Sequence, residues 1–123
     1  MLNWTFLGSI LCFLSVSLGA FGAHGLKSHL SEGNLAVFHT GVTYQFMHSL
    51  SIIILGICIV SGIFNKSLLR YSCICFLAGI VLFSGSLYIL STMQIKWIGF
   101  LTPLGGLLFL IGWILFGLST LNK

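Results

Sequence analysis

Charged residues are so rare in this chain that they limit its possible folds more than any other feature. Of 123 residues, 5 are Lys or Arg and 1 is Asp or Glu. A soluble domain takes about a quarter of its residues from the charged types. Six charges cannot cover a water-facing surface of this size. We therefore predict one membrane-embedded domain, residues 1–123, with membrane lipid as a partner on its outer face.

Four apolar stretches lie between the charges, and each is long enough to cross a membrane as a helix. About 20 apolar residues cross the ~30 Å hydrocarbon core. The connector 65–67 is short, which predicts that the second and third helices are antiparallel neighbours. The predicted fold is an all-α membrane protein with four transmembrane helices in an antiparallel bundle. The predicted spans are about 4–23, 38–64, 70–91 and 98–121.

Residues 24–37 form the one sizeable polar segment. Leu26, Leu30 and Val37 can share one side of a helix, which favours a short amphipathic helix lying in the membrane interface. Gly25 and Gly33 weaken this helix, so a broken helix or a structured loop is the alternative.

Pro103 leaves two possibilities open near the start of the fourth span. Proline lacks an amide proton and clashes with the carbonyl four residues back, here that of Gly99. Either Thr102 caps a helix whose first residue is Pro103, or one longer helix is kinked at the proline.

Small residues recur at helical spacing and predict close packing between helices. Gly8, Cys12, Ser15, Gly19 and Gly22 form one stripe in the first span, and glycines seven apart form two stripes in the fourth. The predicted packing positions are Gly8, Ser15, Gly19, Gly22, Gly79, Gly85, Gly99, Gly105, Gly106 and Gly112.

Basic residues are scattered singly between the spans and serve to orient the chain. Four spans place both termini on one side, with Lys66, Arg70 and Lys123 there and Lys27 and Lys96 opposite. This small excess favours cytoplasmic termini. No basic face is formed, so a nucleic acid is not expected as a partner.

Four sequence blocks, one in or beside each span, resemble a known family. The chain is similar to the YgdD- and YwdK-like proteins, small proteins of the bacterial inner membrane. The resemblance implies a four-helix protein of the plasma membrane and implies no activity. The blocks are Gly19-Ala20-Phe21-Gly22-Ala23-His24-Gly25-Leu26, Thr40-Gly41-Val42-Thr43-Tyr44-Gln45 with His48, Leu82-Phe83-Ser84-Gly85-Ser86-Leu87-Tyr88, and Thr102-Pro103-Leu104-Gly105-Gly106 with Phe109 and Gly112-Trp113.

The polar groups at the start of the second span are the candidate site. On a helix, Tyr44, Gln45 and His48 share one face, and each needs a hydrogen-bond partner in hydrocarbon. One interpretation is that they join the helices together; the other is a small polar cavity that binds a ligand or passes a proton. Candidate partners on the third and fourth spans are Ser84, Ser86, Tyr88 and Thr102.

Metal binding and catalysis find little support in the residues. His24, His29 and His39 are weak metal candidates on one side of the membrane, but no HxxxH pair exists. The only carboxylate side chain is Glu32, and no catalytic constellation is visible, so we expect neither an enzyme nor a cofactor. We expect a structural or interaction component that packs as a homo-oligomer or beside a larger partner. The alternative is a binding, transport or sensing module with its site around Tyr44, Gln45 and His48.

Overall fold

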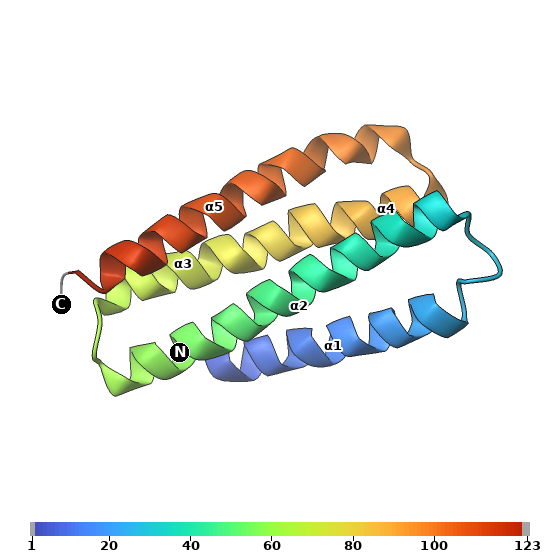
Figure 1. Ribbon diagram of the computed structural model, residues 1–123. Coiled ribbons are helices and arrows are strands. Elements are labelled where there is room, and N and C mark those ends of the chain that lie inside the picture. The colour runs from blue at the N-terminus through green and yellow to red at the C-terminus, as the bar shows by residue number, and fades with distance from the viewer. Residues whose placement is uncertain (1, 122–123) are drawn as a thin grey trace.

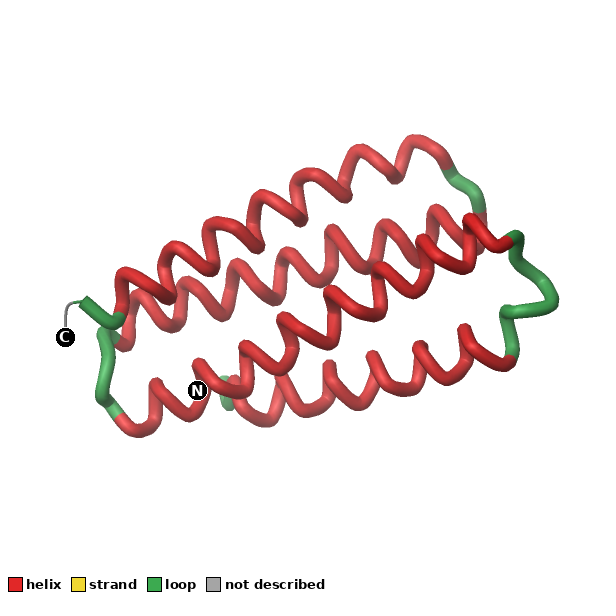
Figure 2. The backbone as a smooth tube through the Cα atoms, in the orientation of Figure 1, coloured by secondary structure: helices red, strands yellow, loops and turns green. Residues whose placement is uncertain are grey.

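The computed structural model describes residues 2–121 as four long helical stretches joined by short connectors (Figures 1 and 2). All four stretches are long and apolar enough to cross a membrane. The predicted all-α, four-span architecture is confirmed. The elements are α1 (Trp4–His24), α2 (Glu32–Ser61), α3 (Lys66–Gly79), the π-helical segment η1 (Ile80–Ser84), α4 (Gly85–Met93), the 3-10 helix η2 (Lys96–Phe100) and α5 (Leu101–Ser119).

Side-chain caps mark the starts of α1, α2 and α3. The Ser31 hydroxyl accepts a hydrogen bond from the Asn34 amide, at 3.1 Å, and thereby starts α2 at Glu32. Residues 24–37 are therefore not a separate interfacial helix. His24 ends α1, residues 25–30 form a turn, as the loop alternative holds, and residues 32–37 are the first turns of α2.

The structure excludes the first alternative for Pro103 and has one longer helical stretch, Lys96–Ser119, which begins with the 3-10 helix η2. Leu101 is the first residue of α5, directly after η2, so Pro103 is the third residue of the helix. The first four amides of a helix have no partner within it, so the missing proton of Pro103 costs no hydrogen bond. Thr102 is not a cap, because its hydroxyl is hydrogen-bonded to the hydroxyl of Ser86.

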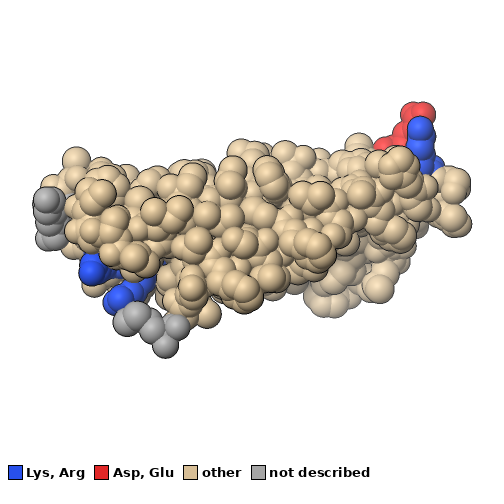
Figure 3. All heavy atoms as spheres, turned by 90° about the horizontal axis from the view of Figure 1, so that it is seen from below, with Lys and Arg blue, Asp and Glu red and all other residues tan. Residues whose placement is uncertain are grey.

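The helices pack mainly in chain order rather than as a closed ring. In Figure 1, α1, α2, the α3–η1–α4 stretch and α5 lie side by side. α1 packs chiefly on α2, and α5 packs chiefly on α3 and η1. The Asn65 amide donates to the Ser119 carbonyl at 3.1 Å, so the α2–α3 connector and the end of α5 lie together. On the face shown in Figure 3, the basic and acidic atoms lie at the two ends of the molecule.

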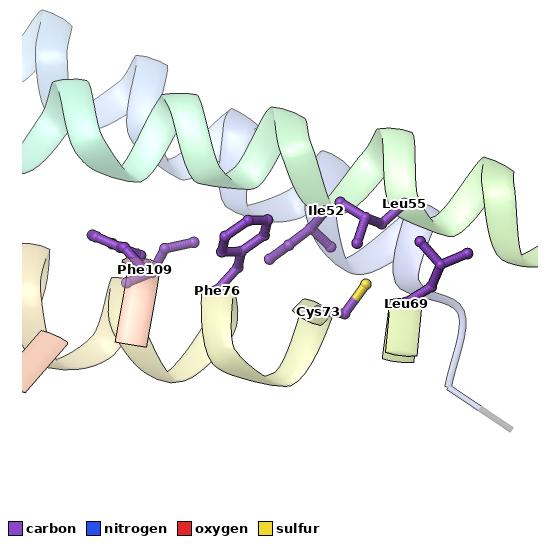
Figure 4. Close-up of a cluster of buried hydrophobic side chains, with 7 residues drawn as sticks. Ile52, Leu55, Leu69, Cys73, Phe76 and Phe109 are labelled. Atoms are coloured by element: carbon purple, nitrogen blue, oxygen red, sulfur yellow. The ribbon is translucent and has the colours of Figure 1, made fainter. Parts of the chain in front are cut away.

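A cluster of buried hydrophobic side chains joins α2, α3, η1 and α5 (Figure 4). Phe76 and Ile52 are fully buried at its centre, and Cys73 packs there as a small apolar residue with no disulfide partner. This cluster holds the middle two stretches together. Its members are Ile52, Leu55, Leu69, Cys73, Phe76, Ile80 and Phe109.

Close helix approach occurs at some of the predicted glycines and not at others. A Cβ on Gly105 would lie 2.7 Å from the Cβ of Phe83, and one on Gly8 would lie 2.9 Å from the Ser49 carbonyl oxygen. By contrast, a Cβ on Gly85 or Gly99 would meet nothing within 4 Å. The prediction of close packing at Gly85 and Gly99 is therefore wrong within the chain, because both point into open space.

Two further close approaches escape the sequence pattern, and one predicted position packs only loosely. A Cβ on Gly56 would lie 2.7 Å from the amide nitrogen of Thr5, and one on Gly41 would lie 2.8 Å from the Tyr88 ring. Neither glycine belongs to the recognised stripes. Gly106 has its nearest neighbour, the Phe83 ring, at 3.8 Å, which is ordinary contact.

Membrane topology gives a first prediction. With the four native cysteines replaced by alanine, single cysteines at Ser67 and Thr120 should react with a membrane-impermeant maleimide from one side of the membrane. A cysteine at Ser28 should react from the opposite side. Labelling of intact cells and inverted vesicles measures this, and the charge bias favours the cytoplasm for Ser67 and Thr120. Labelling of Ser67→Cys and Thr120→Cys from opposite sides would contradict four spans.

Candidate functional site

The polar side chains of α2 divide into two groups that face different helices. Gln45 faces α1 and α4, where its Nε2 donates to the Leu11 carbonyl at 3.0 Å and its Oε1 accepts from the Tyr88 hydroxyl at 2.6 Å. Tyr44 and His48 face α5 instead. The three residues thus do not line one common cavity.

Hydroxyl groups make further bonds between helices, mostly to main-chain carbonyls. Ser84 donates to the Gly41 carbonyl at 2.7 Å, Ser15 to that of Val42 at 2.9 Å, and Ser72 to that of Gly112 at 2.7 Å. Within residues 2–121, no buried side-chain nitrogen or oxygen lacks a hydrogen-bond partner. In a bilayer an unpaired polar group costs several kcal/mol. These bonds therefore hold the helices together.

His48 uses both ring nitrogens. Its Nε2 lies 3.1 Å from the Trp113 Nε1, and its Nδ1 lies 2.8 Å from the Tyr44 carbonyl oxygen. An indole nitrogen can only donate, so Nε2 accepts, and Nδ1 carries the proton that is donated to the carbonyl. The hydrogen-bond geometry thus assigns one neutral tautomer of His48.

Aromatic rings surround His48 on three sides. The His48 and Phe109 rings are stacked with centroids 3.6 Å apart and planes 9° apart, and Phe76 meets His48 edge-on at 5.2 Å. Tyr44 packs on Phe83 with centroids 4.6 Å apart. The π-helical segment η1 supplies Phe83, and Gly105 allows α5 to approach the Phe83 backbone closely.

A groove of about 570 Å³ lies between α2 and α5 beside these rings. Tyr44, His48, Phe83, Phe109 and Trp113 line it, together with Gly106 and aliphatic side chains. Tyr44 is 38% exposed and Trp113 43% exposed, so the groove opens at the membrane-facing surface. Tyr44 lies 12 residues after Glu32, which places it about 18 Å along α2, in the middle part of the span.

Sequence reasoning found only part of this site. Tyr44 and His48 were predicted, but Gln45, Ser84, Ser86, Tyr88 and Thr102 are taken up by bonds between helices. It did not assign Phe83, Phe109 or Trp113 to the site. The spacing of four between Phe109 and Trp113, which places both on one helical face, is the signal that identifies them.

The weak metal candidates are not brought together. Among residues 2–121, no group of three or more His, Cys, Asp and Glu side chains is placed to hold a metal ion. His29 Nδ1 lies 3.0 Å from the Gly25 carbonyl oxygen, and His39 lies beside a separate pocket with Glu32.

Comparison with known proteins gives a family for the chain. The model of the family "Protein of unknown function (DUF423)" matches residues 18–106. UPF0382 membrane protein SH2409 of Staphylococcus haemolyticus is 45% identical over 93% of this chain and 91% of its own length. UPF0382 membrane protein YwdK of Bacillus subtilis is 47% identical over 89% of this chain and 88% of its own length. No solved structure matches the chain.

These relatives are bacterial proteins named for the membrane, which agrees with four helices that can span it. The resemblance to YwdK-like proteins seen in the sequence blocks is confirmed. The chain is a multi-pass bacterial membrane protein that belongs to the DUF423 family.

Proposed function

We propose that this protein is a non-catalytic binding protein whose site is the aromatic groove between α2 and α5. The ligand is a flat, apolar ring molecule that enters from the bilayer and has a hydrogen-bond acceptor on its ring. The observation on which this proposal rests is the groove of about 570 Å³, lined by Tyr44, His48 and Trp113 in the middle of the span.

The hydroxyl of Tyr44 supports a ligand with an acceptor. The hydrogen bond from His48 ends on the main-chain carbonyl of Tyr44, not on its side chain. The Tyr44 hydroxyl makes no hydrogen bond to any group within residues 2–121. A phenol in hydrocarbon needs a partner, since no water is present there. Phospholipid ester groups lie near the membrane surface, so the middle of the span favours an apolar molecule with a carbonyl on a ring.

The shape of the groove supports a flat ring. Aromatic side chains prefer offset-stacked or edge-to-face neighbours, which a planar ligand offers and an acyl chain does not. His48 is held by two hydrogen bonds and by stacking on Phe109, so this wall of the groove is rigid before a ligand arrives.

An alkyl naphthoquinone is a suitable probe for this proposal. In a Trp4→Phe, Trp97→Phe background, Trp113 is the single tryptophan and should show saturable quenching by the probe. Gly106→Leu should fill the groove and weaken binding of the probe at least tenfold. Tyr44→Phe should weaken it about threefold, because one hydrogen bond to the ligand is lost. Fluorescence titration in lipid nanodiscs gives both dissociation constants.

Gly117→Leu is the matched control, because a Cβ on Gly117 meets nothing within 4 Å and Gly117 does not line the groove. It should bind the probe as the wild type does. If quenching were equal in all variants and rose linearly with the concentration of the probe, it would come from random collisions in the bilayer. That result would contradict the proposal.

A structural role, as an oligomer or beside a larger membrane protein, is the second candidate. The packing of α1 favours it, because α1 packs chiefly on α2 and leaves large apolar side chains such as Phe6 and Phe13 exposed. The mass of the detergent complex separates the two candidates. A groove variant that changes this mass and leaves probe binding unchanged would favour the structural role.

A further inference from the structure

A charged pocket and a second groove follow one another along α2. The pocket, of about 440 Å³, lies where the α1–α2 connector meets α2 and is lined by Lys27, Glu32 and His39 with three apolar side chains. Glu32 is the only acidic residue of the chain, and Figure 3 shows it beside basic atoms at this end of the molecule. Lys27 and Glu32 are both exposed, so both charges are available to a ligand.

An apolar groove begins about one turn further along α2, since His39 lines the pocket and Thr43 lines the groove. This groove has a volume of about 510 Å³ and lies between α1 and α2, where Val16 and Ala20 face Val42. Ala36 and His39 line the pocket, and Thr43 and Met47 line the groove. Their spacings of three, four and four residues place all four on one stripe of the helix.

The two features together have the polarity of a phospholipid. At the membrane surface the pocket offers a cation and an anion, and the adjoining groove inside the membrane offers an apolar wall. We propose that this face binds one molecule of phosphatidylethanolamine, with its headgroup in the pocket and an acyl chain in the groove between α1 and α2.

Charge complementarity selects this headgroup. The phosphate of the lipid suits the Lys27 ammonium and the His39 ring, and the lipid ammonium suits the Glu32 carboxylate. Phosphatidylcholine has a trimethylated nitrogen and cannot donate a hydrogen bond to Glu32. Phosphatidylglycerol has no cation to offer. The groove between α1 and α2 and the groove between α2 and α5 share Met47 and no other lining residue, and each proposal is tested with variants that line only its own site.

Native mass spectrometry of the purified full-length protein tests the proposal with defined lipids. The wild type should retain one phosphatidylethanolamine about fivefold better than phosphatidylcholine or phosphatidylglycerol. Lys27→Gln should lower retention of phosphatidylethanolamine about fivefold, the effect of one surface cation on a phosphate. Glu32→Gln should abolish the preference over phosphatidylglycerol. Ala20→Phe should fill the groove and lower retention of all three lipids.

Lys96→Gln is the matched control, because Lys96 lies at the same end of the molecule but lines a different pocket. It should retain lipid as the wild type does. Equal retention of the three lipids by the wild type, or an equal loss in Lys96→Gln and Lys27→Gln, would overturn the proposal. Free phosphoethanolamine should not displace the lipid, since it has no acyl chain for the groove; displacement would also overturn the proposal.

Discussion

Gly105→Ala should destabilise the protein by about 3 kcal/mol, although it adds one methyl group. A Cβ at this position would lie 2.7 Å from the Cβ of Phe83 and 2.8 Å from its Cα. A side chain could rotate away, but the backbone of η1 cannot move without disturbing the Ser84 bond to the Gly41 carbonyl. Thermal unfolding in detergent, followed by near-ultraviolet circular dichroism, measures the loss.

Gly117→Ala is the control on the same helix, because a Cβ on Gly117 meets nothing within 4 Å. It should be neutral or slightly stabilising, since alanine favours a helix over glycine by about 1 kcal/mol. Gly106→Ala should behave in the same way, with its nearest neighbour at 3.8 Å. Equal melting temperatures for Gly105→Ala and Gly117→Ala would show that α5 does not approach η1 as described.

His48→Ala should cost about 3 kcal/mol, the usual effect of removing a buried ring. The side chain is 3% exposed and fills the space between Phe109 and Phe76, so its removal leaves a cavity. It also leaves the Trp113 indole without its acceptor. Reversible unfolding in a denaturing detergent gives the free energy of unfolding.

The bond between His48 and Trp113 can be separated from the packing by a double-mutant cycle. His48→Phe and Trp113→Phe keep an aromatic ring and remove the bond, so each should cost less than His48→Ala. The coupling energy between the two should be about 0.6 kcal/mol, typical of such bonds in membranes. A coupling of zero would mean that the indole and the imidazole do not form this bond in the bilayer.

The number and type of the spans could be predicted because lipid imposes a simple rule. Long apolar runs separated by single charges have one stable arrangement in a bilayer. The ends of the helices were harder to predict, because they depend on single caps such as Ser31. The second span was predicted to begin at about residue 38, and the Ser31 cap starts the helix that contains this span at Glu32.

The candidate site was harder to predict. The spacing of residues shows which of them share a face of one helix, but it does not show which other helix packs against that face. Gln45 and His48 lie 60° apart on a helical wheel, yet Gln45 contacts α1 and His48 contacts α5. The glycines show the same limit. The sequence pattern predicts close helix packing at both Gly85 and Gly105, but of these two only Gly105 lies against the backbone of another helix, at Phe83. The π-helical turn η1, which changes the facing of the residues around Phe83, leaves no simple sequence signal.

Several bonds between helices run from a hydroxyl or amide side chain to a main-chain carbonyl. A substitution can remove the donor of such a bond but not its acceptor. Ser15 donates to the carbonyl of Val42, and Gln45 to that of Leu11. Every residue type has a main-chain carbonyl, so a change of apolar side chain at Leu11 or Val42 leaves the acceptor in place. Only the donors need a particular chemistry. A few serines and one glutamine can therefore hold the helices in register while many of the surrounding apolar residues are replaced by other apolar residues.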